Sequence, residues 1–514
     1  MYSNKENVNI LTALLVKHGV RYAVCCPGSR NSPIVHNLNE CPDVMCYPVT
    51  DERSAGFYAL GMAQALNEPV IVCVTSGTAL LNVLPAVAEA YYQHQPLVVI
   101  SADRPVEWID QLDGQTLPQP DALGRFVRRA VSLPEPHDDD SRWYCNRLVN
   151  ESLVIADGPV HINVPISEPL FDYTVEVLPD ERIIELMPAC VTSETLNHVV
   201  RRFMNASRPM LISGQPMNPL LDEAVLLAGD DEHYVPDFVL YTGGSIVSKR
   251  LKRYLRNACE TWVVNATGEV TDTFMNLTRV IVGDGEVVAD AVRSTLEQQP
   301  HPFVTLWEEL LAKARAAVEA FEPAYSQMAV VKCFEKSYEG SASRCVFHYA
   351  NSAAIRLANI YANHSVYCNR GVNGIEGSLS TAAGFSCVTD EKVLCVIGDL
   401  SFFYDQNALW NQNLRGNFRI LLLNNGKGGI FNMLRGLEQS PARDHFVAAQ
   451  HETTAEGVCQ QNSVSYLKAT TMEEMQQAVD TLLHTESNRP VLLEVFTDDA
   501  VDAQVMKDYY ALFL

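Results

Sequence analysis

VLCVIGDLSFF, residues 393–403, is an apolar run that stops at a glycine and a carboxylate, Gly398 and Asp399. Apolar runs of this length are typical of buried strands. A second run, RILLLNN at 419–425, follows a helical segment and ends at Asn425. This alternation predicts a right-handed βαβ unit, in which the ends of two neighbouring strands lie side by side. Asp399 and Asn425 are therefore expected to converge.

The same pattern recurs in three parts of the chain. Short apolar runs, such as RYAVCC at 21–26 and RPMLIS at 208–213, end at glycine or polar residues and are followed by helical segments. Runs that alternate with helices of about 10–15 residues are typical of parallel sheets. We therefore predict an α/β protein with three doubly wound parallel-sheet domains, at residues 1–178, 185–325 and 330–514.

Composition excludes several classes of protein. The 514 residues are 47% hydrophobic and 19% charged, as in an ordinary folded protein, and the net charge of −24 disfavours binding to nucleic acid or to anionic membranes. No apolar stretch is long enough for a membrane anchor, and the N-terminal residues lack the apolar core of a signal peptide. The 14 cysteines form no C-x-x-C pair, which favours a reducing compartment, so a cytoplasmic location is expected.

Asp399 and Asn425 have the chemistry of a metal site. Carboxylate and amide oxygens suit Mg²⁺, or Mn²⁺, which shares its ligand shell with substrate phosphates. The glycine-rich GKGG after Asn425 lets the backbone approach an ion and its phosphates. The alternative for Asp399 is a simple helix N-cap. A Walker A loop is excluded, because Gly428 follows Lys427 where Ser or Thr is needed.

The GD and NN pairs at this spacing resemble the cofactor motif of thiamine diphosphate enzymes. Leu400 occupies the third position, as in the branch of that family in which G-D-L-S is usual. Other segments resemble the same branch, which acts in menaquinone biosynthesis. They are CPGSRNSP (26–33), TDERSAGFYALGMAQA (50–65), SKRL (248–251), NSAAIR (351–356) and NRGVNGIEG (369–377).

The resemblance implies a fold and a reaction. The first domain would bind the pyrimidine ring of thiamine diphosphate and the third its diphosphate. The enzyme would be a transferase that decarboxylates 2-oxoglutarate on the cofactor and adds the succinyl group to isochorismate in a 1,4-addition. In this family the first and third domains of different subunits meet around the cofactor, so a homodimer or homotetramer is expected.

The resemblance also assigns residues to the cofactor. Glu52 would hydrogen-bond the aminopyrimidine ring and promote its proton chemistry, although an acidic residue at a helix N-terminus is a simpler reading. Ile375 would wedge the cofactor into a bent shape, although it could be a core residue. The third metal ligand would be the backbone carbonyl of Lys427, beside Asp399 and Asn425. The implied cofactor-binding set is Glu52, Ser76, Gly77, Ile375, Gly398, Leu400, Ser401 and Asn425.

Basic residues would bind the two dianionic substrates. Arginine grips carboxylates with two hydrogen bonds, and several arginines follow apolar runs, although a lone arginine is usually a surface residue. Ser352 and Arg356, spaced i and i+4, would clamp the distal carboxylate of 2-oxoglutarate. Glu52, Arg30 and Arg370 are the expected catalytic residues. The substrate-binding set is Ser29, Arg30, Arg104, Gln115, Lys249, Arg250, Ser352, Arg356 and Arg370.

Two other hypotheses stay open from the sequence. The chain could be another thiamine diphosphate enzyme, such as a 2-oxo acid decarboxylase or an acetolactate-synthase-like protein, which would share Glu52, Asp399 and Asn425 but not the basic set. It could also be an inactive protein of the same fold that serves as a binding module. The three intact residues argue against the last hypothesis.

Overall fold

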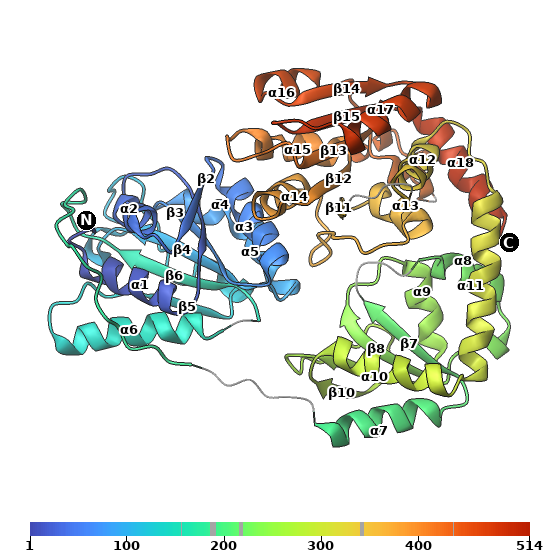
Figure 1. Ribbon diagram of the computed structural model, residues 1–514, viewed down its shortest axis with the longest axis horizontal. Helices are drawn as coiled ribbons and strands as arrows, with labels where there is room; N and C mark the ends of the chain where they lie inside the picture. Colours follow the sequence, from blue (N-terminus) through green and yellow to red (C-terminus); the bar gives the residue numbers. More distant parts are fainter. Residues whose placement is uncertain (156, 186–191, 215–218, 340–343, 435) are drawn as a thin grey trace.

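Three parallel β-sheets form the protein, which confirms the predicted fold class. The computed structural model describes residues 1–155, 157–185, 192–214, 219–339, 344–434 and 436–514. In Figure 1 the N-terminal sheet lies at the left, the middle sheet at the lower right and the C-terminal sheet above it. Each predicted domain range contains one sheet, while the domain boundaries themselves stay a prediction.

The N-terminal sheet has six parallel strands in the order β2-β1-β3-β4-β6-β5. The central strands β3 and β4 are buried along their whole length, because helices cover both faces of the sheet. The strands are β1 (Tyr22–Cys25), β2 (Met45–Pro48), β3 (Val70–Val74), β4 (Leu97–Asp103), β5 (Arg129–Ser132) and β6 (Val160–Pro165). The helices are α1 (Glu6–Lys17), α2 (Ser32–Glu40), α3 (Glu52–Leu66), α4 (Thr78–Asn82), α5 (Leu84–Tyr92) and α6 (Asp139–Leu153).

The middle sheet has four parallel strands in the order β10-β9-β8-β7. Its helix α11 extends toward the C-terminal domain, where Ala314 and Val318 join the core of that domain. The strands are β7 (Pro209–Gly214), β8 (Phe238–Gly244), β9 (Glu260–Asn265) and β10 (Leu277–Val282). The helices are α7 (Ser193–Met204), α8 (Leu221–Ala228), α9 (Lys249–Tyr254), α10 (Gly285–Gln298) and α11 (Pro302–Ala320).

The C-terminal sheet has five parallel strands in the order β11-β12-β13-β15-β14. Gly398 at the end of β12 pairs with Leu423 of β13, so the two strands end side by side as predicted. The strands are β11 (Cys345–Tyr349), β12 (Lys392–Gly398), β13 (Phe418–Asn424), β14 (Ser465–Ala469) and β15 (Val491–Phe496). The helices are α12 (Gln327–Glu339), α13 (Ala353–Tyr361), α14 (Ser378–Cys387), α15 (Asp399–Tyr404), α16 (Glu456–Gln461), α17 (Met472–His484) and α18 (Asp499–Ala511).

The helix after Asp399 is shorter than its sequence pattern indicates. Helix α15 ends at Tyr404, and a 3-10 helix at Gln406–Leu409 follows it. Asp405 lies between them with its side chain fully buried, where it accepts hydrogen bonds from the backbone N–H and the hydroxyl of Ser380. Because these contacts draw the chain inward, the helix does not continue.

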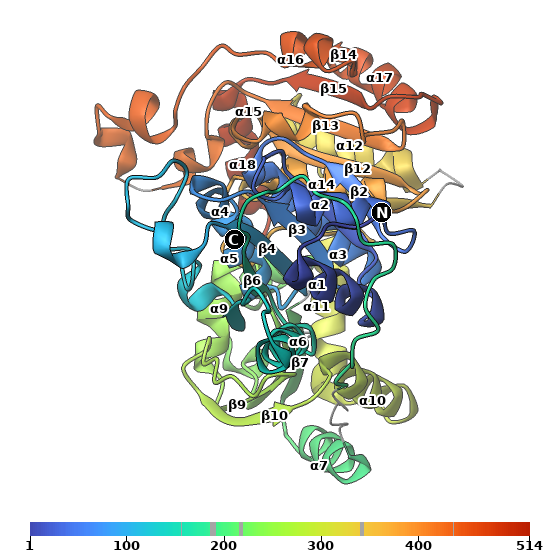
Figure 2. The ribbon, with the colours of Figure 1, turned by 90° about the vertical axis from the view of Figure 1, so that its left-hand side faces the viewer.

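Helices α3 and α14 join the N-terminal and C-terminal domains at close range (Figure 2). A Cβ atom on Gly61 of α3 would lie 1.9 Å from the carbonyl oxygen of Thr381, and one on Gly384 of α14 would lie 2.2 Å from that of Tyr58. Glycine is therefore required at both positions. The hydroxyl of Tyr58 donates a buried hydrogen bond of 2.6 Å to the carbonyl of Ala408, which adds to the contact between the domains.

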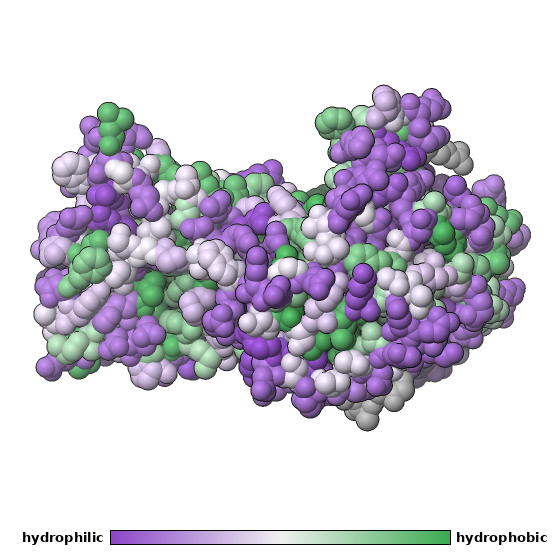
Figure 3. Space-filling view, turned by 90° about the horizontal axis from the view of Figure 1, so that it is seen from above, coloured by the Kyte–Doolittle hydropathy of each residue, from purple (hydrophilic) through white to green (hydrophobic). Residues whose placement is uncertain are grey.

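The face of the molecule seen from above is mostly polar. Hydrophilic residues dominate the face in Figure 3, and the hydrophobic residues on it are scattered. In the part of the chain that the structure describes, every helix is too short or too polar to cross a bilayer.

Candidate active site

Asp399 is a buried carboxylate at the carboxyl end of β12. It is the first residue of α15, and Gly398 rather than Asp399 occupies the N-cap position. Its Oδ1 atom accepts a hydrogen bond of 2.7 Å from the N–H of Leu400, and Oδ2 accepts one of 2.9 Å from Gly426 after β13. His451 Nε2 lies 3.4 Å from Oδ2, and this contact with Asp399 raises the pKa of His451 above its usual value. The carboxylate thus connects the ends of both strands.

Asn425 and Lys427 follow β13 beside this carboxylate. Asn425 donates from Nδ2 to Asp502 over 3.0 Å, and no hydrogen bond from the described residues reaches its Oδ1 atom, which is the oxygen that an ion would need. The ammonium group of Lys427 binds Asp499 over 2.8 Å, so its side chain is engaged with α18. The bond to Asp499 raises the pKa of Lys427.

The groups around Asp399 fit a divalent ion and a diphosphate. The predicted donors are one carboxylate, one amide and one backbone carbonyl, which are the oxygen ligands that Mg²⁺ accepts. A Cβ atom on Gly398 would meet nothing within 4 Å, so open space adjoins the end of β12. Within the described residues no group of three His, Cys, Asp or Glu side chains could hold a metal. The predicted site does not need such a group, because two of its three ligands are an amide and a backbone carbonyl.

Ser401 and Ile375 meet at the start of α15. The hydroxyl of Ser401 donates a hydrogen bond to the carbonyl oxygen of Ile375. The side chain of Ile375 is 41% exposed in the single chain, so it is not a core residue there. An exposed Ile375 can contact a bound cofactor, and this contact stays a prediction.

Glu52 is the first residue of α3, as its sequence predicts. The helix is capped by Asp51, whose side chain accepts a hydrogen bond from the N–H of Ser54. Asn82 donates to Glu52 Oε2 over 3.4 Å. Asp51 caps the helix, while Glu52 lies in its first turn, where an acidic residue is favourable, and its role toward the cofactor stays a prediction.

Ser76 and Gly77 form a tight turn between β3 and α4. Gly77 has φ 84°, a conformation that favours glycine, and its N–H donates a hydrogen bond of 2.7 Å to Gln119. Gln115 donates over 3.5 Å to the carbonyl of Ser76, so this predicted substrate residue does lie beside the predicted cofactor residues. Gln119 is fully buried, and nothing in the local sequence pattern singles it out.

Arg30 and Arg104 both approach Glu168 at the carboxyl end of the N-terminal sheet. Arg30 is buried and donates to the carbonyl of Ile166 over 2.9 Å and to Glu168 over 3.1 Å. Arg104 pairs with Asp113 over 2.7 Å and lies 4.0 Å from Glu168. Ser29 is exposed beside them. Both guanidinium groups are therefore paired with acidic side chains of this chain.

Arg370, unlike Arg30 and Arg104, has no acidic partner in an ion pair within the described part of the chain. It is partly buried, donates to Asn351 Oδ1 over 3.1 Å, and its Nε atom has no hydrogen-bond partner. Among the described residues it forms no ion pair with a carboxylate. Burial lowers the pKa of Arg370, and the positive charge of Arg356 lowers it further. A partly buried guanidinium with no carboxylate partner is suited to bind an anion.

Lysines of α9 extend this positive region. Burial lowers the pKa of Lys252, and the charges of Arg370 and Lys249 add to the effect. Arg250, the other predicted residue of this helix, instead lies 3.7 Å from Asp222 and its guanidinium stacks over the ring of Tyr510. Sequence reasoning missed Lys252, although its position three residues after Lys249 places both on one face of the helix.

Ser352 and Arg356 do not form the expected pair on one helical face. Ser352 is the N-cap of α13 with φ 73° and ψ −121°, so it lies outside the helix. Arg356 lines a small polar cavity with Asp222, Glu223 and Ser248 between the middle and C-terminal domains. No hydrogen bond joins Ser352 to Arg356 within the described residues, and their shared role stays a prediction.

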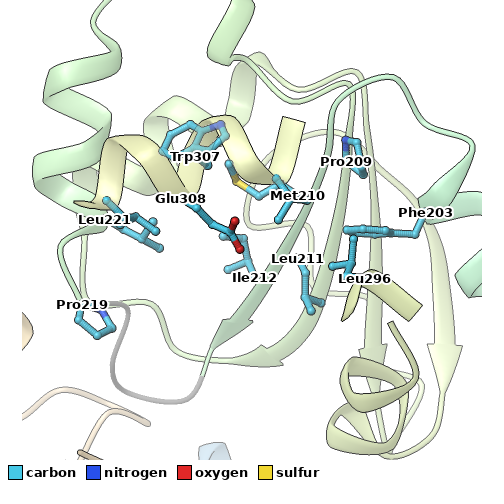
Figure 4. Close-up of a pocket in the computed structure, with 12 residues that line it drawn as sticks. Phe203, Pro209, Met210, Leu211, Ile212, Pro219, Leu221, Leu296, Trp307 and Glu308 are labelled. Carbon is cyan, nitrogen blue, oxygen red and sulfur yellow. The ribbon is translucent and has the colours of Figure 1, made fainter. Parts of the chain in front are cut away.

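A larger cavity of about 350 Å³ lies in the middle domain, away from these residues (Figure 4). Its walls are mostly apolar, with Trp307 and Glu308 of α11 facing Met210 and Ile212 of β7. It contains none of the predicted site residues.

The chain matches two families of known domains. Residues 6–123 match the thiamine pyrophosphate enzyme, N-terminal TPP binding domain, and residues 350–495 match the C-terminal TPP binding domain. The crystal structure of benzoylformate decarboxylase from Polynucleobacter necessarius superposes with a TM-score of 0.71 at 16% identity, over 97% of this chain and 99% of the other. That similarity concerns the fold.

Several curated proteins are similar over their whole length. The 2-succinyl-5-enolpyruvyl-6-hydroxy-3-cyclohexene-1-carboxylate synthases of Bacteroides thetaiotaomicron and Bacteroides fragilis are each 43% identical, with 99% of both chains covered. The synthase of Porphyromonas gingivalis is 34% identical, over 99% of this chain and 97% of the other.

The turn at Ser76 and Gly77 and the groups around Asp399 lie in the two matched TPP-binding domains, which together define a thiamine diphosphate-dependent enzyme. This confirms the resemblance found in the sequence. The chain belongs to the 2-succinyl-5-enolpyruvyl-6-hydroxy-3-cyclohexene-1-carboxylate synthase family.

Proposed function

We propose that the protein converts 2-oxoglutarate and isochorismate into 2-succinyl-5-enolpyruvyl-6-hydroxy-3-cyclohexene-1-carboxylate and CO₂, a step of menaquinone biosynthesis. The main support is the positive region of Arg370, Arg356, Lys252 and Lys249, whose members form no ion pairs among the described residues. Both substrates are dianions, and unpaired cations in a partly buried site are suited to bind carboxylates.

The alternative is a 2-oxo acid decarboxylase or an acetolactate-synthase-like enzyme. Such an enzyme acts on substrates with fewer carboxylates, and it would have no use for several unpaired cations near one site. The positive region therefore favours the synthase, in agreement with the full-length relatives.

The residues around Asp399 fit the cofactor and its ion. Thiamine diphosphate, when bound, supplies the carbanion chemistry by which a 2-oxo acid loses CO₂. Asp399, Asn425 Oδ1 and the carbonyl of Lys427 would hold Mg²⁺ or Mn²⁺, and the turn at Ser76 and Gly77 would border the cofactor. Glu52 would hold and release the proton of the aminopyrimidine ring.

The basic residues would orient the substrates. Arg370 would bind a substrate carboxylate through its guanidinium group, and Arg356 would bind the distal carboxylate of 2-oxoglutarate. Arg30 and Arg104 are held by Glu168 and Asp113, so they would bind substrate only by exchanging those partners.

The proposed assembly is a homodimer or homotetramer. Exposed apolar side chains lie in loops and short helical turns of both cofactor-binding domains, with Trp108 52%, Leu112 102% and Phe446 84% exposed. Exposed residues of this kind are typical of surfaces that contact another subunit. The proposed location is the cytoplasm, because each cysteine in the described part of the chain is a free thiol.

A product assay tests the proposal. The purified protein, with thiamine diphosphate and Mg²⁺, should consume 2-oxoglutarate and isochorismate together and release one CO₂ for each product molecule. Pyruvate alone serves as the control for the alternative. Equal or faster turnover of pyruvate, with no product from isochorismate, would contradict the proposed function.

A further inference from the structure

A carboxylate of the N-terminal domain holds the loop that carries Arg370. Glu89 lies on α5 and is only 3% exposed. Its Oε1 atom accepts a hydrogen bond of 2.6 Å from the N–H of Gly371, and Oε2 accepts one of 2.7 Å from Val372. The contact thus spans two domains and fixes the two residues directly after Arg370.

The same loop is held on its other side by its own domain. Asn351 donates to the carbonyl of Asn369 over 2.6 Å and to that of Gly374 over 2.8 Å, while its Oδ1 atom accepts from Arg370. The residues on both sides of Arg370 therefore have fixed backbone positions. Asn351 and Glu89 act from opposite domains on one short loop.

The packing between α5 and the loop leaves no room for adjustment. A Cβ atom on Gly371 would lie 2.8 Å from the carbonyl oxygen of Glu89 and 3.0 Å from Cβ of Tyr92. The backbone of the loop therefore rests directly on α5, and the Glu89 carboxylate meets its N–H groups at hydrogen-bond distance.

The charge of Glu89 has no ion-pair partner among the described residues. A buried carboxylate is costly unless hydrogen-bond donors or a cation compensate it. Gln93 donates to Oε1 over 2.5 Å, the loop supplies two backbone N–H groups, and the charge of Arg370 is close enough to interact with it. The carboxylate of Glu89 therefore stabilises the loop, which carries the partly buried cation of Arg370.

We propose that Glu89 is a positioning residue, which acts from the N-terminal domain to hold Arg370 in the direction that a substrate carboxylate requires. The inference rests on the proposed function, because it needs Arg370 to contact a substrate. Glu89 itself touches neither substrate nor cofactor. It sets the geometry of the residue that does.

A double-mutant cycle tests this role. Breaking a buried, charge-assisted contact costs about 2–5 kcal/mol, so Arg370→Ala should lower kcat/KM for a dianionic substrate by about 30-fold or more. Glu89→Ala should lower it by about 10-fold or more, with unchanged affinity for thiamine diphosphate. If Glu89 acts through Arg370, the double variant should lose little more activity than Arg370→Ala alone. Losses that multiply would overturn the proposal.

A matched variant separates positioning from folding. Glu335 is also 3% exposed and accepts hydrogen bonds from Tyr349 and His364, and among the described residues it has no hydrogen bond or ion pair with Arg370 or its loop. Glu335→Gln should lower thermal stability, and its effect on kcat/KM should simply multiply with that of Arg370→Ala. Coupling of the same size for both glutamates would overturn the positioning role, since it would reflect general destabilisation.

A conservative variant covers the case in which Glu89→Ala does not fold. Glu89→Gln keeps one acceptor oxygen for the loop, so it should fold and show a smaller loss that is likewise absent in the Arg370→Ala background. If instead Arg370→Ala keeps wild-type kcat/KM for both substrates in an active enzyme, the substrate set of the proposed function fails. If Arg370→Ala is impaired but the Glu89 loss persists in that background, only the present inference fails.

Discussion

The carboxylate of Asp399 and the backbone N–H of Gly426 are 2.9 Å apart, although 27 positions separate them in the chain. The bond joins the carboxyl ends of β12 and β13, where the open edge of a parallel sheet receives its ligands. It places the carboxylate beside Asn425 before any ion is bound.

We expect Asp399→Ala to abolish the Mg²⁺ dependence of thiamine diphosphate binding, because it removes the charged ligand of the ion. Titration of the cofactor by calorimetry, with and without Mg²⁺, measures this. Lys427→Met is the matched control: it should keep the metal dependence, because the predicted ligand is the main-chain carbonyl and the ammonium group binds Asp499 instead. Wild-type metal dependence in the Asp399 variant would contradict the assignment.

Glu52→Gln should separate cofactor binding from proton transfer. The amide keeps the size and polarity of the side chain but cannot take up a proton. Binding of thiamine diphosphate should persist, while exchange of the C2 proton slows by about two to four orders of magnitude, the usual range for general acid–base catalysis. NMR of the bound cofactor measures the exchange, and an unchanged rate would refute the role of Glu52.

Arg356→Ala should reduce the preference for 2-oxoglutarate over pyruvate. Only the five-carbon acid has a distal carboxylate, so its kcat/KM should fall by about 30-fold or more, while that for pyruvate falls much less. Arg253→Ala, on the exposed side of α9, serves as the control and should change neither value. Equal losses for both acids would assign Arg356 to isochorismate or to folding instead.

Gly61→Ala should destabilise the protein, because the new methyl group would lie 1.9 Å from the carbonyl oxygen of Thr381. Overpacking of this kind costs about 1–3 kcal/mol. In α16, a Cβ on Gly457 would meet nothing within 4 Å, so Gly457→Ala should be neutral or stabilising by up to about 1 kcal/mol. Urea unfolding compares the two variants, and equal stabilities would contradict the close packing of α3 and α14.

His348 should make the protein sensitive to acid. Burial between Tyr367 and Phe385 lowers the pKa of His348 to about 3, so it stays neutral in the folded state while the unfolded chain takes up a proton below about pH 6.5. The free energy of unfolding therefore falls by about 1.4 kcal/mol for each pH unit from 6.5 toward 3. Above about pH 6.5 His348 is neutral in both states, so this loss of stability is absent there.

His348→Phe keeps an aromatic ring in this cluster and removes the titrating group. Urea unfolding between pH 4 and 7 should show a slope that is lower by about 1.4 kcal/mol per pH unit than that of the unchanged protein. Parallel stability curves for the two proteins would show that His348 does not titrate as its burial indicates.

The strand-end residues could be predicted from the sequence, because a βαβ connection fixes which strands are neighbours. Asp399 and Asn425 follow apolar runs that the chain must bury, so their meeting depends only on local pattern and handedness. Glu52 could be placed at a helix start because the helical pattern of the sequence begins at that residue. Their assignment to a cofactor came from the resemblance, not from the pattern.

The contacts between domains could not be predicted in this way. Glu89 lies 282 positions from Gly371, inside an amphipathic helix where a glutamate usually faces solvent. The position of Ser352 outside α13 was missed as well, because a positive φ at a serine has no signal in the local sequence. The Glu89 contact depends on how separately folded domains dock, which hydrophobic periodicity does not encode.

The crossing of α3 and α14 decides which parts of the enzyme can move. Glycines at the crossing bring the two helix backbones together without an intervening layer of side chains, so the surfaces cannot slide or rotate without breaking main-chain contacts. Hinge or shear opening between these two domains is thereby blocked. In the proposed assembly the cofactor lies between domains of different subunits, so substrate entry and product release would use motions of the subunit interface and of the strand-end loops, while this crossing within one chain stays fixed.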